Sequence, residues 1–183
     1  MGLTEDELTP LVWSWREVNP NIVAFWYEVN RVSVEAVRQK GLIMRTHGIG
    51  FLCKQNLLFI RLPSGRLLSY PAPQIGVDQD GRDGLTYMGM DSQKKWCSIR
   101  TYGARLVENI VQAIARDCLA VSMDRLAAAG FQICFHVHDE VVAEAPEGSR
   151  WQDMAEIMAQ PIDWAPGLLL RADGYETPFY MKD

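Results

Sequence analysis

Two acidic residues, Asp139 and Glu140, lie where two short apolar runs of the sequence meet. The runs are Phe131–Val137 and Glu140–Ala145, a pattern that predicts a tight β-hairpin with Asp139 at its bend. A carboxylate held on a hairpin tip suits a hard cation such as Mg²⁺, which takes one or two protein carboxylates and completes its shell with water and phosphate oxygens. Aspartate also stabilises ordinary surface turns. Spacing alone therefore leaves a magnesium ligand and a plain bend as alternatives.

The histidines that precede this bend offer a third interpretation. Strand alternation places Phe135 and Val137 on one face and His136 and His138 on the other. Two imidazoles on one strand face are a common part of a zinc site. The remaining histidine, His47, belongs to a different expected element, so no third ligand is evident. A zinc-dependent hydrolase that uses His136 and His138 stays open as an alternative.

A second polar set recurs along a long helix, expected from a Thr101 cap to about Ala129 and ended by Gly130. At about 100° per residue, four donor side chains share one narrow stripe. They are Arg105, Asn109, Gln112 and Arg116. The opposite side carries apolar residues expected in the core: Val107, Ile110, Ile114 and Cys118. Any surface helix has a polar side, but a row of donors also matches the minor-groove acceptors of duplex DNA, which are present at every base pair.

The remaining pattern predicts an α+β fold with a mainly antiparallel sheet. The expected elements before the long helix are helices opened by Thr9-Pro10 and Asn19-Pro20, and strands at Gly50–Gln55, Leu57–Leu62, Arg66–Tyr70, Leu85–Met88 and Lys95–Arg100. After the hairpin come a helix with a Ser149–Gln152 capping box and a last strand at Leu168–Tyr175.

Composition and length are those of one ordinary globular domain or of a piece of a larger one. The chain has 183 residues, 48% of them hydrophobic and 22% charged, which excludes intrinsic disorder. No apolar run reaches the roughly 18 residues of a membrane span. The four cysteines form no CxxC pair and favour a reducing compartment. We therefore expect a cytoplasmic protein.

The net charge of −5 argues against a nucleic-acid partner, but the charge is unevenly distributed. The stretch from Ala36 to Val77 contains six of the 18 basic residues and none of the 23 acidic ones. The six are Arg38, Lys40, Arg45, Lys54, Arg61 and Arg66. Such a stretch is either a solvated strand face or a surface that faces phosphates.

The long helix and the hairpin together resemble the C-terminal palm of family A DNA polymerases, in the phage-type branch of the DNA polymerase I family. The matching segments cover essentially the whole chain in order. They are Trp15-Arg16-Glu17-Val18-Asn19-Pro20-Asn21-Ile22-Val23, Leu62-Pro63-Ser64-Gly65-Arg66, the run from Thr101-Tyr102-Gly103 to Asp117, Val137-His138-Asp139-Glu140, and Trp164-Ala165-Pro166-Gly167.

The resemblance implies that the hairpin is the family's motif C. Asp139 would be one of two aspartates that hold a catalytic Mg²⁺ pair, His138 would lie against the primer terminus, and Glu140 would support the site. The helix stripe would follow the minor groove of the primer–template duplex. Family members space these donors at four-residue steps, whereas Asn109 and Gln112 are three residues apart.

The resemblance also implies that parts of the polymerase are absent from this sequence. The second metal-binding aspartate (motif A) and the fingers helix that grips the dNTP (motif B) have no counterpart here. Residues 1–48 would be helices that follow the fingers helix, and residues 49–183 the palm. We expect a DNA-directed DNA polymerase piece of a bacterial or phage-infected cell that needs a partner chain carrying motifs A and B. A non-catalytic remnant that binds primer–template DNA is the alternative.

Overall fold

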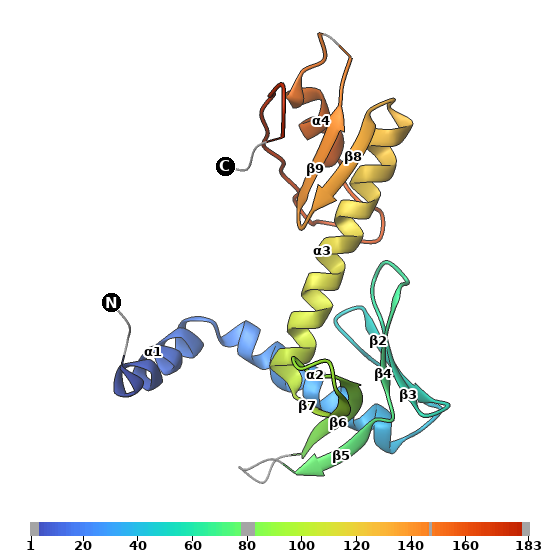
Figure 1. Ribbon diagram of the computed structural model, residues 1–183. Helices are drawn as coiled ribbons and strands as arrows, with labels where there is room; N and C mark the ends of the chain where they lie inside the picture. The colour runs from blue at the N-terminus through green and yellow to red at the C-terminus, as the bar shows by residue number, and fades with distance from the viewer. Residues whose placement is uncertain (1–3, 78–82, 147, 181–183) are drawn as a thin grey trace. The chain divides into compact units, whose positions relative to one another are not determined.

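The computed structural model describes residues 4–77, 83–146 and 148–180 (Figure 1). These residues form a mixed α/β structure in which every strand pair is antiparallel, as the sequence predicts. The strands are divided among three separate sheets rather than gathered into one. The chain forms two compact units, Met1–Ile110 and Val111–Asp183, with the division inside the longest helix.

The first unit begins with two helices, α1 (Glu5–Val18) and α2 (Pro20–Arg38). Pro20 opens α2 as expected, but α1 begins well before the predicted Thr9-Pro10 and runs through Pro10. Its start is fixed by Thr4, whose backbone N–H and hydroxyl both donate to the Glu7 carboxylate at 2.9 Å. These hydrogen bonds lower the pKa of Glu7 and form a capping box that the Thr-Pro signal did not reveal.

A four-stranded sheet packs one face against α2. Its strands, in spatial order, are β1 (Ile43–Thr46), β2 (Ile49–Lys54), β3 (Leu57–Arg61) and β4 (Leu67–Pro71). Phe51 and Ile60 are paired across β2 and β3 and are fully buried. Val29 and Val32 of α2 are buried as well, and α2 contacts β1 and β2, so the core of this unit lies between helix and sheet.

The first unit also contains a three-stranded sheet that leads directly into the long helix. Its strands are β5 (Gln74–Val77), β6 (Asp83–Met90) and β7 (Trp96–Thr101), and the helix is α3 (Gly103–Ala128). The predicted Thr101 cap is wrong, because Thr101 is the last residue of β7 and its buried Oγ1 has no hydrogen-bond partner among the described residues. The Tyr102 carbonyl instead accepts the first helical N–H, from Leu106.

The second unit contains the rest of α3, the hairpin strands β8 (Gln132–Val137) and β9 (Glu140–Glu144), and α4 (Trp151–Met158). Gly130 ends α3 with a positive φ of 94°, as predicted for that position. Arg125 of α3 donates to the carbonyl oxygens of Gln160 and Pro161 at 2.9 and 2.7 Å. These two hydrogen bonds hold the segment that follows α4 against α3.

Two sequence predictions fail in this unit. The N-cap of α4 is Arg150, paired with Asp153, rather than Ser149 with Gln152. The segment Leu168–Tyr175 forms no strand. It pairs with no described strand, and Glu176, the next residue, accepts a hydrogen bond from the Trp151 backbone N–H at 3.0 Å. Its apolar residues stay largely exposed, since Leu169 is 94% accessible to solvent.

Candidate functional site

The predicted hairpin is present, with His138 and Asp139 as its two-residue loop. Val137 pairs with Glu140, which closes the turn directly around these two residues. His138 has a φ of 50°, the left-handed conformation that the first position of a two-residue hairpin loop requires. Both loop side chains are exposed, and Glu140 is half-buried at the start of β9. The fold therefore presents the Asp139 carboxylate to solvent on a short, fixed loop.

The two faces of β8 have different neighbours. His136 Nε2 lies 3.3 Å from the Arg116 guanidinium of α3, whereas Phe135 makes an edge-to-face contact with Tyr180 at 5.0 Å between ring centroids. Adjacent residues thus point to opposite sides, as alternation predicts. A register shift between Ile133 and Phe135 precedes this part of the strand and was not visible in the sequence.

The hairpin supplies a ligand for a hard cation but not a complete metal site. Asp139 is an exposed carboxylate, which fits one position in a magnesium shell. The described residues contain no group of three or more His, Cys, Asp or Glu side chains that could hold a metal ion. Any magnesium site built on Asp139 therefore needs further ligands.

The geometry disfavours the zinc alternative. A guanidinium is only a donor, so the His136 Nε2 that faces Arg116 must accept with the lone pair that a zinc ion would need. The guanidinium charge also repels a divalent cation at the same atom. His136 is better explained as a partner of Arg116 that holds β8 against α3.

The four predicted donors of α3 have different environments. Arg105 and Asn109 belong to the first unit, and Gln112 and Arg116 to the second. Three of the four are exposed, while Asn109 is half-buried. On the opposite side, Val107, Ile110 and Cys118 are buried as predicted, and Ile114 is half-buried. Nothing in the geometry tests their contact with DNA, which stays a prediction.

Asn109 also has a structural partner that the sequence did not reveal. Its Nδ2 donates to the Tyr70 hydroxyl of β4 at 2.9 Å. Tyr70 is only 6% exposed and packs edge to face on Tyr87 of β6, with ring centroids 5.0 Å apart. Burial raises the pKa of the Tyr70 phenol, and the bond from Asn109 opposes part of that rise. One amide hydrogen of Asn109 is thus used to tie α3 to the two sheets of the first unit.

We expect Tyr70→Phe to destabilise the first unit by about 1–2 kcal/mol, because the half-buried Asn109 amide loses its acceptor. Denaturant unfolding measures this loss. Tyr102→Phe is the matched control: Tyr102 is 56% exposed, so its free energy of unfolding should change by less than about 0.5 kcal/mol. Equal stability of the Tyr70→Phe variant and the native chain would show that the hydrogen bond does not hold α3.

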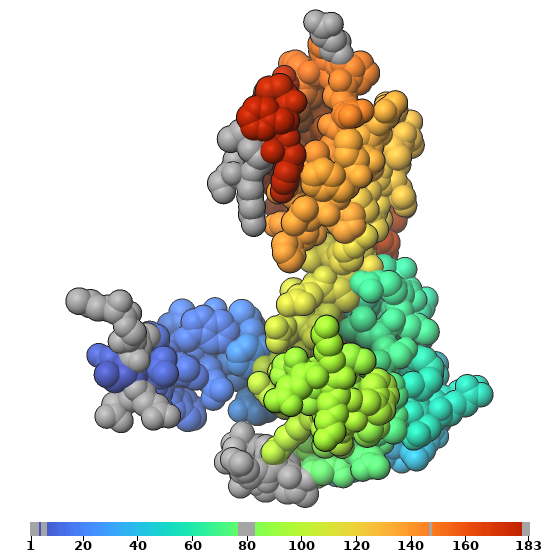
Figure 2. Space-filling view, in the orientation of Figure 1, coloured from blue at the N-terminus to red at the C-terminus, as the bar shows by residue number. Residues whose placement is uncertain are grey.

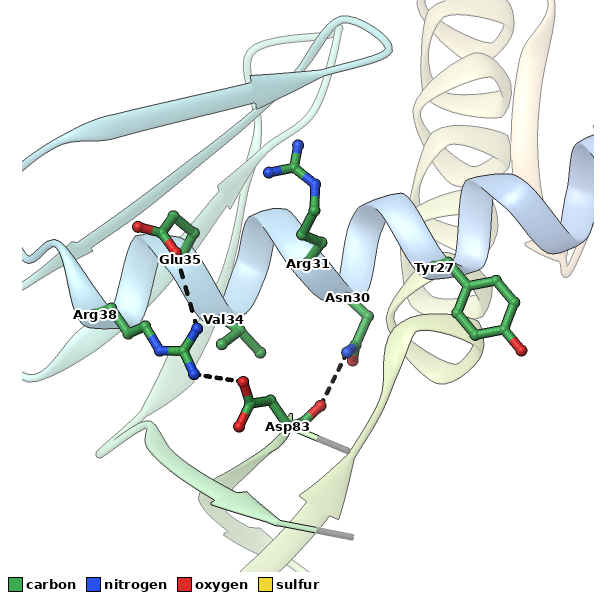
Figure 3. Close-up of a pocket in the computed structure, with 7 residues that line it drawn as sticks. All are labelled: Tyr27, Asn30, Arg31, Val34, Glu35, Arg38 and Asp83. Carbon is green, nitrogen blue, oxygen red and sulfur yellow. Dashed lines mark hydrogen bonds and ion pairs between the residues drawn. The ribbon is translucent and has the colours of Figure 1, made fainter. Parts of the chain in front are cut away.

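A shallow cleft lies between α2 and the start of β6 (Figure 3). It is lined by Tyr27, Asn30, Arg31, Val34, Glu35, Arg38 and Asp83. Arg38 forms ion pairs with Asp83 and Glu35, and Asn30 Nδ2 donates to the Asp83 backbone carbonyl at 3.0 Å. Its charged groups therefore already have partners within the first unit. We interpret these contacts as structural, because they hold the start of β6 against α2.

Comparison with known proteins gives one informative relative. The chain is 48% identical over 185 residues to a protein named DNA polymerase from Bacillus phage SP02. The match covers the whole of this chain, which spans 28% of the length of that curated relative. No protein-family model matches the chain, and no solved structure matches it significantly. Within the described residues, no helix is both long and apolar enough to cross a membrane.

Proposed function

We propose that this chain is the palm-containing part of a family A, DNA-directed DNA polymerase, which adds dNTPs to a primer 3′-end on a DNA template. The observation that carries the proposal is the similarity to the phage SP02 protein along the whole chain, combined with an exposed aspartate on the tip of a two-residue hairpin. Such an enzyme would work in the cytoplasm of a phage-infected bacterium.

The hairpin residues have separate roles in this proposal. Asp139 would hold Mg²⁺, which when bound activates the primer 3′-hydroxyl and stabilises the leaving pyrophosphate. His138, next to it in the turn, would lie against the primer terminus. Glu140 is the first residue of β9 and is half-buried, so it would stabilise the turn rather than contact the substrate. The two-residue turn restrains the backbone that carries the carboxylate, which would contribute to the preorganisation of the site.

The donors of α3 would bind the duplex behind the primer terminus. Arg105, Gln112 and Arg116 are exposed residues, and the Arg116 guanidinium also contacts His136 at 3.3 Å. Minor-groove acceptors occur at every base pair, so such contacts would hold correctly paired duplex of any sequence. Asn109 would use the amide hydrogen that Tyr70 does not occupy.

The active site would be completed from outside these 183 residues. One aspartate alone does not complete a two-metal site, and the described residues contain no cluster of three or more His, Cys, Asp or Glu side chains that would supply the other ligands. A polypeptide carrying motifs A and B, comparable to part of the 72% of the phage SP02 relative that this chain does not span, would provide them. We therefore expect the isolated chain to be inactive.

A segment exchange tests the proposal. Residues 1–183 replace the matching segment of the phage SP02 protein, and the purified chimaera is given a primed template, dNTPs and Mg²⁺. Because the two segments are 48% identical, we expect the chimaera to extend primers at a rate within about tenfold of the unmodified relative, an allowance of about 1.4 kcal/mol in the barrier.

Two controls accompany the exchange. The unmodified phage protein must extend the primer, and the isolated 183-residue chain should not. Extension by the isolated chain would show that it needs no partner segment. A folded chimaera that binds primer–template DNA without extending it would favour the non-catalytic remnant instead.

A further inference from the structure

The face of the β1–β4 sheet that points away from α2 has an unusual composition. Strand register brings residues from all four strands into rows across it. One row is Arg45, Gly50, Arg61 and Leu67; the next is Ile43, Leu52, Phe59 and Ser69; the third contains Lys54, Leu57 and Pro71. We call these residues the outer sheet face. Figure 2 shows much of this part of the chain, in cyan and blue-green, at the molecular surface.

The outer sheet face carries positive charge that nothing on it neutralises. Arg45, Lys54 and Arg61 are exposed and form no ion pair with any described residue. No acidic residue occurs anywhere between Ala36 and Val77. In a chain whose net charge is −5, three uncompensated cations on one small sheet are a local attraction for a polyanion.

Gly50 leaves a gap between two of these cations. It lies between Arg45 and Arg61 in the same row, and a Cβ placed on it would point toward the Arg61 Cβ at 3.6 Å, so its bare side is on the outer face. Neighbouring strands are about 4.8 Å apart, which separates the two arginine backbones by roughly 10 Å. Gly50 thus puts no side chain between the two arginines, while the Arg61 Nη2 reaches toward the β3–β4 turn, 3.9 Å from the position that a Cβ on Gly65 would take.

Apolar and aromatic groups occupy the rows beside the charges. Phe59 is half-exposed at the centre, with the small Ser69 next to it, and Ile43 and Leu67 are 57% and 51% exposed. Unpaired bases stack on aromatic rings, whereas the bases of a duplex are already stacked on one another. A surface with cationic side chains around an aromatic ring therefore favours binding of single-stranded nucleic acid over duplex.

We propose that the outer sheet face binds single-stranded DNA, with Arg45, Lys54 and Arg61 on phosphates and Phe59 under a base. This goes beyond the proposed polymerase function, since the face lies in the first unit and its binding does not depend on Asp139. The basic residues give the affinity its salt dependence, and the ring gives it the preference for unpaired bases. Another protein segment is the competing occupant, and the experiment separates the two.

The test measures binding of the 183-residue chain to a fluorescent oligo-dT of about 20 nucleotides, long enough for a site of this class. In the triple variant Arg45→Ala, Lys54→Ala and Arg61→Ala, we expect affinity to fall at least about tenfold. The salt dependence should also weaken, by about 2 in the slope of log K against log salt, since three phosphate contacts are lost. Phe59→Ala should weaken oligo-dT binding about tenfold without changing that slope.

The matched control removes three exposed cations elsewhere: Lys95→Ala, Arg100→Ala and Arg171→Ala. It changes the net charge equally and should lower affinity by no more than about twofold. Unfolding curves confirm that each variant folds. If the triple variant does not fold, the single variants Arg45→Ala and Lys54→Ala are measured in its place. Unchanged oligo-dT binding in the outer-face variants would overturn the proposal and leave a protein segment as the occupant. Equal loss of blunt-duplex binding in Phe59→Ala would contradict the preference for single strands.

Discussion

Replacing Asp139 by asparagine in the chimaera is expected to abolish primer extension, with a rate at least about a thousandfold below that of the unsubstituted chimaera. The side chain keeps its size and loses only its charge, so the hairpin should fold normally around the exposed position. A metal ligand contributes several kcal/mol to stabilising charge in the transition state, and each 1.4 kcal/mol is a factor of ten in rate.

Glu144→Gln is the matched control for this substitution. Glu144 is an exposed carboxylate on the same hairpin, at the end of β9 far from the turn. Its loss removes the same charge and should change the extension rate less than about twofold, which is under 0.5 kcal/mol. Primer–template affinity, measured without dNTPs, should stay nearly unchanged in Asp139→Asn. An extension rate equal to that of the unsubstituted chimaera would remove Asp139 from the mechanism.

Gly103→Ala should have the largest effect on stability of any single substitution proposed here. A Cβ at Gly103 would stand 1.9 Å from the Trp26 carbonyl oxygen of α2, a contact that only a shift of backbone relieves. Alanine favours a helix over glycine by about 1 kcal/mol, but overpacking against backbone costs about 3 kcal/mol or more. We therefore expect a net loss of at least about 2 kcal/mol and a melting temperature lower by roughly 5 °C.

Gly76→Ala is the matched control for Gly103→Ala. It shows whether a loss of stability comes from the close contact at Gly103 or from replacing any glycine by alanine. A Cβ at Gly76 in β5 would meet no atom within 4 Å, and Gly76 has no positive φ that an alanine would strain. Its melting temperature should stay equal to that of the native chain or rise slightly. Equal melting temperatures for Gly103→Ala and the native chain would mean that α2 and α3 do not pack as closely as described.

The elements that sequence predicted well are those with strong local signals. The hairpin was readable because apolar runs flank a two-residue bend, and Gly130 marked the end of α3 through its left-handed conformation. The alternation on β8 correctly separated Phe135 from His136. In each case the information lies within a few residues of the feature, so tertiary contacts were not needed.

The failed predictions depend on contacts between distant segments or on competing local signals. Leu168–Tyr175 is apolar enough for a strand, but a strand also needs a partner edge, and none pairs with it. Thr101 is a good capping residue that the ladder with Leu85 keeps in β7 instead. For α4, Arg150 and Asp153 form the cap one position later than expected. Sequence alone did not rank these alternatives.

The features of the candidate site also divide into those that local sequence predicts and those that depend on contacts between distant segments. Asp139 and His138 were placed at the turn by local pattern, and the structure has them there. The bond between Asn109 and Tyr70 joins residues 39 positions apart, so no local pattern predicts it. Likewise, the need for glycine at position 103 arises from the backbone of α2 and becomes visible only in three dimensions.

A metal-specificity switch at Asp139 tests most directly whether this side chain holds the catalytic ion. Asp139→Cys replaces a hard oxygen ligand by a thiolate, which binds Mg²⁺ poorly and softer cations such as Zn²⁺ or Cd²⁺ well. The measurement is the primer-extension rate of the chimaera in each metal, with Asp139→Ser as the oxygen-bearing control. We predict that the cysteine variant is inactive with Mg²⁺ and regains at least about tenfold more activity than the serine variant with the softer ions. The same ratio of rates across the metals in both variants would contradict a ligand role for Asp139.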